Sequence, residues 1–187
     1  MLHKFRKLSV FNNETFTSLE ITIALAIMSI IMLVGIPSIS ALISSNQAAN
    51  QSHDFIDGIQ LGLNESVKQK KHITLCAKKP AINECINTEN AIIENAWQYG
   101  WLLFTDTNNS GIYDATHDIL LKSQINNSQK VNITAEAYTI TFNSQGHVIR
   151  GDGNYYFSPS KCISNTGHQI ILTKDGDVLA RGGVCQA

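Results

Sequence analysis

The sequence lacks the features that would place it in several large classes of protein. Its 14 Lys and Arg residues almost balance its 15 Asp and Glu residues, and the formal net charge is −1. A protein that binds nucleic acid through a broad basic face needs an excess of positive charge, so this balance argues against that class. The chain has no internal repeat or low-complexity tract, and its hydrophobic fraction of 43% argues against wholesale disorder.

The motifs of common enzymes are also absent from the sequence. It contains no Gly-x-Ser-x-Gly, no Gly-x-x-x-x-Gly-Lys-Ser/Thr and no His-Glu-x-x-His. The six histidines are scattered without metal-site spacing, and no Cys-x-x-Cys occurs. We therefore expect no catalytic residues, no metal ion and no other cofactor, and a protein that is not an enzyme.

The longest stretch without charge lies near the N-terminus. No Asp, Glu, Lys or Arg occurs from Ile21 to Ser52, and residues 21–43 are dense in Ile, Leu, Met, Val and Ala. As a helix, this run reaches roughly 34 Å at about 1.5 Å per residue, enough to cross the ~30 Å hydrocarbon core of a membrane. It is too long for the apolar region of a secretory signal, and no small-residue cleavage pattern follows it. The run therefore predicts a transmembrane helix.

Glu20 stands at the entrance of this run, where a membrane-embedded carboxylate is costly and points to a function. Phe16 lies four residues earlier, on the same face of a helix. A cut between Thr15 and Phe16 would place a new α-ammonium group one turn from the Glu20 carboxylate. Glu20 would then also lie in the first turn, where the helix dipole favours a negative charge. The alternative is an uncleaved anchor in which Glu20 reaches the lipid headgroups.

The N-terminal residues resemble the class III signal of type IV pilins and type II secretion pseudopilins. The matching parts are the short basic leader 1–15, Phe-Thr-Ser-Leu-Glu at residues 16–20 and the apolar run. The resemblance implies that a prepilin peptidase cuts before Phe16 and methylates its amine, and that Glu20 guides the subunit into a filament. Most family members have Gly before the cut. Here that residue is Thr15, which leaves open whether cleavage occurs.

A regular apolar spacing continues beyond the run. Apolar side chains recur at every fourth position: Phe55, Ile59, Leu63 and Val67. This predicts one long helix, with residues 16–43 as a transmembrane or filament-core half and residues 44–71 as an amphipathic half on a globular domain. Gly58 and Gly62 would let a sheet approach closely. A kink is expected near Pro37, where pilins commonly bend this helix.

From His72 onward, short β-prone runs alternate with clusters of Asn, Gly, Asp and Ser. Strands are predicted at residues 73–76 and 101–104, and hairpins at residues 138–149 and 169–180. The sequence thus predicts an α+β fold: a long N-terminal helix packed on an antiparallel β-sheet, with residues 72–187 as a periplasmic globular domain.

Four cysteines occur in the chain: Cys76, Cys85, Cys162 and Cys185. An even number in a domain that faces an oxidising periplasm predicts disulfide bonds, and the sequence allows three pairings. We favour Cys76–Cys85, which closes a short loop, together with Cys162–Cys185, which ties down the last strand. In the loop-entropy model each bond contributes roughly 2–4 kcal/mol.

The middle of the chain is similar to the GspH/FimT family of minor pilins and pseudopilins. The similarity rests on Trp-x-x-Gly-Trp-x-x-Phe-x-Asp at residues 97–106, the Asn-, Gly- and Asp-rich residues 108–120 and a closing Gly-Asp-x-Leu hairpin. It implies a minor subunit, stored in the bacterial inner membrane, that helps to start a filament at or near its tip. The implied partners are the prepilin peptidase, other minor and major pilins or pseudopilins and an inner-membrane assembly platform. Whether the filament is a type II secretion pseudopilus or a type IV pilus stays open.

Two alternative functions remain. Some FimT-like proteins bind DNA through a hairpin of the form Gly-Arg-x-Arg, whereas residues 176–179 here are Gly-Asp-Val-Leu; Lys174, Arg181 and Lys161 are the remaining candidate contacts. A second basic cluster offers phosphate contacts: Lys68, Lys70, Lys71, His72, Lys78 and Lys79. The alternatives are thus a DNA-capture or adhesive tip subunit, and an uncleaved single-pass anchor with a periplasmic ligand-binding domain.

Two further patterns have structural interpretations. Residues 106–114 place Asp, Asn, Ser, Gly and Asp at EF-hand positions, but the bidentate Glu of that loop is replaced by His117. We therefore interpret residues 106–118 as an Asx-rich turn, with calcium binding left open. Trp97, Trp101 and Phe104 are interpreted as core residues.

Overall fold

The computed structural model describes residues 17–86, 96–126, 130–160, 162, 166–183 and 185, without the side chains of residues 33–38. The predicted leader 1–15, with Thr15, and also Phe16 and Lys161 lie outside the described residues. The chain divides into two units, an N-terminal unit of residues 1–39 and a globular unit of residues 40–187. Each unit is described by itself.

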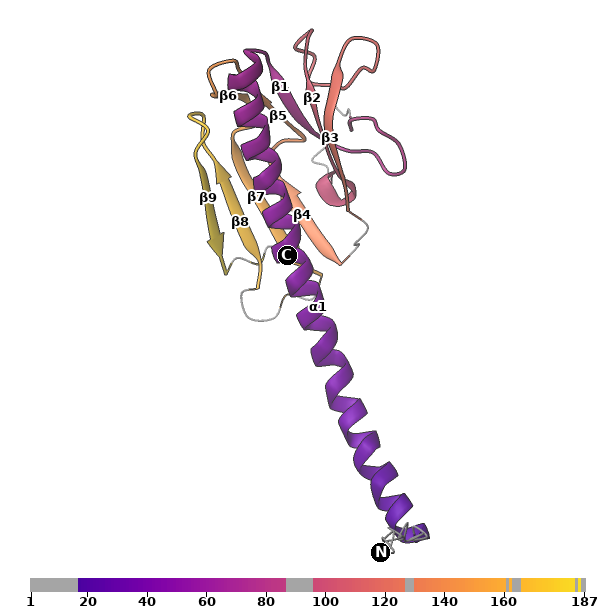
Figure 1. Ribbon diagram of the computed structural model, residues 1–187. Coiled ribbons are helices and arrows are strands. Elements are labelled where there is room, and N and C mark those ends of the chain that lie inside the picture. Colours follow the sequence, from indigo (N-terminus) through magenta and orange to yellow (C-terminus); the bar gives the residue numbers. More distant parts are fainter. Residues whose placement is uncertain are drawn as a thin grey trace, which may run out of the picture. The chain divides into compact units, whose positions relative to one another are not determined.

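One helix, α1 (Ser18–Gln69), has residues in both units (Figure 1). It begins after Thr17, whose side-chain oxygen accepts a hydrogen bond from the Glu20 N–H at 3.3 Å, as an N-cap residue does. The predicted long helix is confirmed over these residues. The kink expected at Pro37 stays a prediction, because the side chain of Pro37 is outside the described set. Within the described part of the chain, no helix has both the length and the apolarity needed to cross a membrane.

Two antiparallel sheets follow α1 in the described residues, where the sequence predicted one (Figure 1). The first has the order β3-β2-β1-β5-β6, from β1 (Ile73–Ala77), β2 (Gly100–Thr105), β3 (Ile119–Ile125), β5 (Thr139–Phe142) and β6 (Val148–Arg150). The second has the order β4-β7-β8-β9, from β4 (Val131–Ala135), β7 (Gly153–Pro159), β8 (His168–Leu172) and β9 (Val178–Gly182). A short 3-10 helix, η1 (Ala96–Tyr99), precedes β2. The strands predicted at residues 73–76 and 101–104 and both hairpins are confirmed.

The two edge strands of the first sheet share an irregularity. The pairing of β2 with β3 shifts register between Leu103 and Phe104. The pairing of β5 with β6 shifts between Thr141 and Phe142. Each shift is a β-bulge or related irregularity, which increases the local twist of the strand pair.

Both sheets share one hydrophobic core with the globular part of α1. The Phe55 ring of α1 has its centroid 4.9 Å from those of Trp97 in η1 and Tyr155 in β7. Gly58 lies on the same helix, and a Cβ added there would stand 2.9 Å from the Trp101 ring. Added at Gly62, it would clash with the Phe142 ring. The helix glycines therefore let two aromatic rings lie directly on the helix, as expected.

A smaller cluster covers the other face of the first sheet. It is formed by Cys76, Cys85, Leu102 and Phe104, with Ile112, Tyr113 and Leu120 packed against it. Side chains alternate between the faces of a strand, so Leu103 joins the main core while its neighbours on β2 join this cluster. The central strands are therefore buried on both faces. Trp97, Trp101 and Phe104 are each at most 2% exposed, which confirms them as core residues.

Candidate functional site

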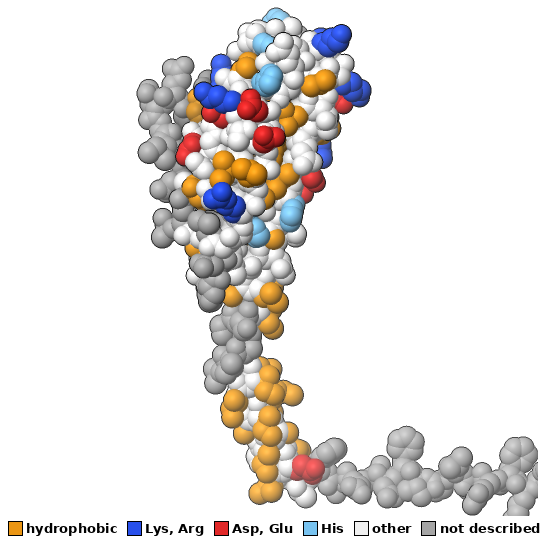
Figure 2. Space-filling view, turned by 90° about the vertical axis from the view of Figure 1, so that its left-hand side faces the viewer, with side chains coloured by type: hydrophobic (Ala, Val, Ile, Leu, Met, Phe, Trp, Pro, Cys, Tyr) orange, Lys and Arg blue, Asp and Glu red, His pale blue; other side chains and the backbone are white. Residues whose placement is uncertain are grey.

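The N-terminal unit presents a helical surface that is apolar and exposed. Every side chain described from residue 17 to residue 32 is exposed, and hydrophobic side chains cover most of the face of this part of α1 that Figure 2 shows. Its large apolar side chains are between 50% and 70% exposed: Leu19, Ile21, Ile23, Leu25, Ile27, Met28, Ile30, Ile31 and Met32. Contiguous apolar surface of this kind marks a site of contact with protein or lipid.

Glu20 is the acidic residue in the first turn of α1, and it is exposed. Its N–H donates to the carbonyl oxygen of Thr17 at 3.0 Å, so the backbone places the side chain at the positive end of the helix dipole. No ion pair within the described residues includes Glu20. Its expected partner, the amine of Phe16, lies outside the described residues, and the predicted pairing remains a prediction.

The four cysteines form two disulfide bonds, Cys76–Cys85 and Cys162–Cys185, with Cα–Cα distances of 5.6 and 6.2 Å. This confirms the favoured pairing. The first bond closes a small loop after β1, residues 78–86, which we call the disulfide loop. Within it Lys79 Nζ contacts Glu84 Oε2 at 2.9 Å, and the Ile86 N–H donates to the Ala77 carbonyl at 2.8 Å.

The Asx-rich turn interpretation of residues 106–118 is confirmed. Asp106 is buried, and its two carboxylate oxygens accept hydrogen bonds from Ser110 N at 3.0 Å and Gly111 N at 2.9 Å. Asp118, also buried, accepts from Thr107 N and Asp114 N, both at 3.0 Å. These carboxylates are thus used to hold the backbone of the loop. The residues that the structure describes contain no cluster of three or more His, Cys, Asp or Glu side chains able to hold a metal ion.

Hydrogen bonds within this loop lower the pKa of Asp114. Its carboxylate accepts hydrogen bonds from the backbone N–H and hydroxyl of Thr116, and contacts His117 Nδ1 at 2.9 Å. Hydrogen bonds from Thr116, followed by the one from His117, lower the pKa of Asp114 to about 2. The side chain that an EF-hand would use to bind a cation is therefore hydrogen-bonded to its own loop.

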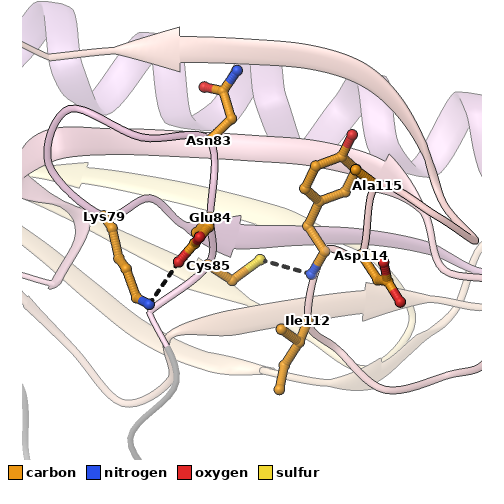
Figure 3. A pocket seen from close by; sticks show the side chains of 8 residues that line it. Lys79, Asn83, Glu84, Cys85, Ile112, Asp114 and Ala115 are labelled. Carbon is orange, nitrogen blue, oxygen red and sulfur yellow. Dashed lines mark hydrogen bonds and ion pairs between the residues drawn. The ribbon is translucent and has the colours of Figure 1, made fainter.

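One pocket, of about 460 Å³, lies between the disulfide loop and the Asx-rich turn (Figure 3). It is lined by Lys79, Asn83, Glu84, Cys85, Ile112, Tyr113, Asp114 and Ala115. The Tyr113 N–H donates to Cys85 Sγ at 3.2 Å, and the Tyr113 ring packs edge-on against Phe104 with centroids 5.4 Å apart. Side chains of both charges line the pocket, so its charge does not select one class of ligand.

A second pocket, of about 250 Å³, lies beyond the C-terminal end of α1. It is lined by Lys70, Lys71, His72, Thr105, Asp106, Thr107, Asn109 and Ser144. Its basic residues belong to the basic cluster noted in the sequence, and its hydroxyl and amide groups come from the end of β2, the following loop and the β5–β6 turn. The sequence did not show that these lysines line a pocket, because the pocket is formed by three segments that lie far apart in the sequence.

Two of the candidate DNA contacts, Lys174 and Arg181, lie in the described residues. Lys174 is exposed in the β8–β9 turn, beside Asp175 and Asp177. Arg181 is exposed on β9, opposite Gln169 of β8. The acidic neighbours of Lys174 reduce the attraction of this hairpin for phosphate groups.

The comparisons with known proteins agree with this architecture. Residues 51–177 match the family model described as type II transport protein GspH. The crystal structure of the type IV minor pilin FimU of Pseudomonas aeruginosa, strain PAO1, is similar, with a TM-score of 0.52 and 14% identity over 73% of this chain and 89% of that chain. A second crystal form of FimU gives a TM-score of 0.49 and 12% identity over 71% of this chain and 91% of that chain. At such identities the first match shows a shared fold, a helix packed on antiparallel sheets. No curated protein matches the sequence.

Proposed function

The chain belongs to the family of the type II transport protein GspH, and we propose that it is a minor pilin or pseudopilin that enters a filament after processing by a prepilin peptidase. Pilins and pseudopilins are structural subunits, so the prediction that the protein is not an enzyme is confirmed. Its place is at or near the filament tip, where it helps to start assembly.

The observation that carries this proposal is the exposed apolar part of α1. Burial of one large apolar side chain is favourable by roughly 1.5–3 kcal/mol, and nine of them between residues 19 and 32 are at least half exposed. A free subunit in water would not gain this stabilisation, because these side chains would stay in contact with water. Lipid around residues 21–43 before assembly, and the helices of other subunits afterwards, would both supply it. We therefore propose storage in the bacterial inner membrane, with a single span and a periplasmic globular unit.

Glu20 has a separate role in the proposal. A carboxylate that moves from a membrane to a filament core needs a partner with positive charge in both places. The α-ammonium group of Phe16, exposed by a cut after Thr15, would be that partner. Other pilins or pseudopilins and an inner-membrane assembly platform complete the set of proposed partners. This set of partners is equally compatible with a type II secretion pseudopilus and with a type IV pilus.

The first test is the intact mass of the protein from cells with and without a prepilin peptidase. We expect a loss of residues 1–15 and the gain of one methyl group only when the peptidase is present. An unprocessed chain in both samples would contradict processing, and the uncleaved anchor would then be the better interpretation.

The second test substitutes the carboxylate. Glu20→Ala should leave membrane insertion intact and lower the amount in sheared filaments by about tenfold or more, because it leaves a buried ammonium group without a partner. Asp57→Ala is the matched control, since Asp57 is an exposed acidic residue of the same helix. Equal incorporation of both variants into filaments would contradict the proposed role of Glu20.

A further inference from the structure

The pocket at the C-terminal end of α1 is lined by two lysines of the basic cluster that take part in no ion pair within the described residues. Of the six residues in the basic cluster, Lys68 pairs with Glu65 at 3.0 Å and Lys79 with Glu84 at 2.9 Å. Lys78 is 3% exposed, and its Nζ lies 3.4 Å from a backbone carbonyl. Lys70 and Lys71, by contrast, take part in no ion pair within the described residues. The cluster is thus divided, and its unpaired lysines line one pocket.

The backbone around this pocket is also unusual. Lys70 follows the last residue of α1 with a φ of 53°, in the left-handed conformation that helices usually give to Gly at this position. Asn109, on the opposite loop, has a φ of 56°. Only one further non-glycine residue in the described chain, Ala81, has a positive φ. Two of these three residues therefore line the same pocket, and such strained positions concentrate at functional sites.

The floor of the pocket is fixed by hydrogen bonds. The carboxylate of Asp106 accepts hydrogen bonds from the Ser110 and Gly111 N–H groups of its own loop and from the Thr74 hydroxyl of β1, 2.9 Å away. Asn109 Oδ1 contacts His72 Nδ1, and the amide NH2 of Asn109 retains its donors. Donor groups on the α1 end, the loop after β2 and the β5–β6 turn therefore remain for a ligand.

We propose that this pocket binds a phosphate group. Lysine is a compact point charge that binds phosphate oxygens in many proteins, and two lysines line this pocket. The amide NH2 of Asn109 and the hydroxyl of Ser144 add donors from two further segments, which match oxygens that point in several directions. A volume of about 250 Å³ holds a phosphate and a small part of its carrier. The inference does not depend on the proposed function, because it concerns a different surface.

The test is calorimetric titration of the full chain, in micelles of an uncharged detergent at low ionic strength, with inorganic phosphate. We expect saturable binding at one site, weakened about tenfold or more by Lys70→Gln with Lys71→Gln, because charge-assisted hydrogen bonds are lost. Lys68→Gln with Lys79→Gln removes the same charge outside the pocket and should change affinity by less than about twofold. Absence of saturable binding, or equal weakening in both double variants, would overturn the proposal.

A third variant tests the same pocket without a change at Lys70, whose backbone has a positive φ. Ser144→Ala removes one exposed hydroxyl of the lining, and we expect it to weaken binding about threefold with an unchanged unfolding temperature. Unchanged affinity in this variant would place the phosphate elsewhere.

Three other probes identify the source of the phosphate. Tighter binding of glycerophosphoglycerol than of inorganic phosphate would indicate a lipid headgroup, and the reverse order would indicate the free ion. Glycerol 3-phosphate serves as the monoester between them. Equal binding of acetate would overturn the assignment, because the pocket would then accept any small anion.

Discussion

The two units of the chain differ in where their apolar side chains lie. Ile27, in the N-terminal unit, is 54% exposed, whereas Phe55, on the same helix in the globular unit, is 2% exposed. Apolar surface is favourable only when it is removed from water. The globular unit does this with its own sheets, and in our proposal lipid or other subunits do it for the N-terminal unit. One helix thus carries a segment that packs in the core and a segment to which the proposal assigns assembly.

The largest expected difference in stability between the two units follows from shortening one apolar side chain in each. Phe55→Ala removes a ring that packs against Trp97, Tyr155 and Phe157, and should lower the free energy of unfolding by about 3–5 kcal/mol. Ile27→Ala should leave the free energy of unfolding of the globular unit unchanged within about 0.5 kcal/mol. Urea unfolding followed by tryptophan fluorescence measures both. A large loss of stability in Ile27→Ala would show that the distinction is wrong.

A smaller effect is expected from the disulfide bonds, which occur only in the globular unit. Replacing Cys76 and Cys85 together by Ala should lower the free energy of unfolding by about 2–4 kcal/mol. The corresponding replacement of Cys162 and Cys185 should act in the same range, because its longer loop of 23 residues adds little entropy. Unfolding of each double variant, with the disulfide-bonded wild-type protein as reference, gives the values. Neither variant should change membrane insertion.

The smallest expected effect is the titration of one carboxylate, Asp114, in the globular unit. Hydrogen bonds from Thr116 and His117 lower the pKa of Asp114 from 3.8 to about 2. A lowered folded-state pKa means that the carboxylate stabilises the turn above pH of about 4, and that this contribution is lost as the pH falls from about 4 toward 2. NMR titration of the Asp114 carboxyl carbon should show a midpoint near pH 2, and a midpoint near 4 would contradict the hydrogen bonding. In Asp114→Asn, the protection of the amides of residues 114–118 relative to their intrinsic exchange rates should change less with pH in this range.

Much of the fold was predictable because the signals were local. The four-residue spacing of Phe55 and Ile59 predicted the packed face of α1, and the turn residues Asn143 to Gly146 predicted the β5–β6 hairpin. The cysteine pairing followed from short sequence separation. The strands β3, β4 and β7 and the division into two sheets were missed. β3 shows no period-two burial, and β7 begins with Gly and ends with Pro, residues that usually mark turns.

The candidate sites were less accessible to sequence reasoning. The basic cluster was visible as a run of residues, but its division into paired, buried and unpaired lysines depends on Glu65, Glu84 and the fold around Lys78. The pocket beside Lys70 and Lys71 needs Ser144, which is more than seventy residues away in the sequence. No local pattern carries that information. The exposed apolar surface of the N-terminal unit, in contrast, was evident from composition alone.

The register shifts at both edges of the first sheet bear on how the subunit avoids the wrong kind of polymer. A flat, regular edge strand offers its free N–H and C=O groups to another chain and is a route to amyloid-like stacking. The twist introduced at Leu103–Phe104 beside β3, and at Thr141–Phe142 beside β6, makes these edges poor templates. In the proposed filament, the helix thereby stays the favoured surface for growth, and the edges of the first sheet are kept out of aggregates.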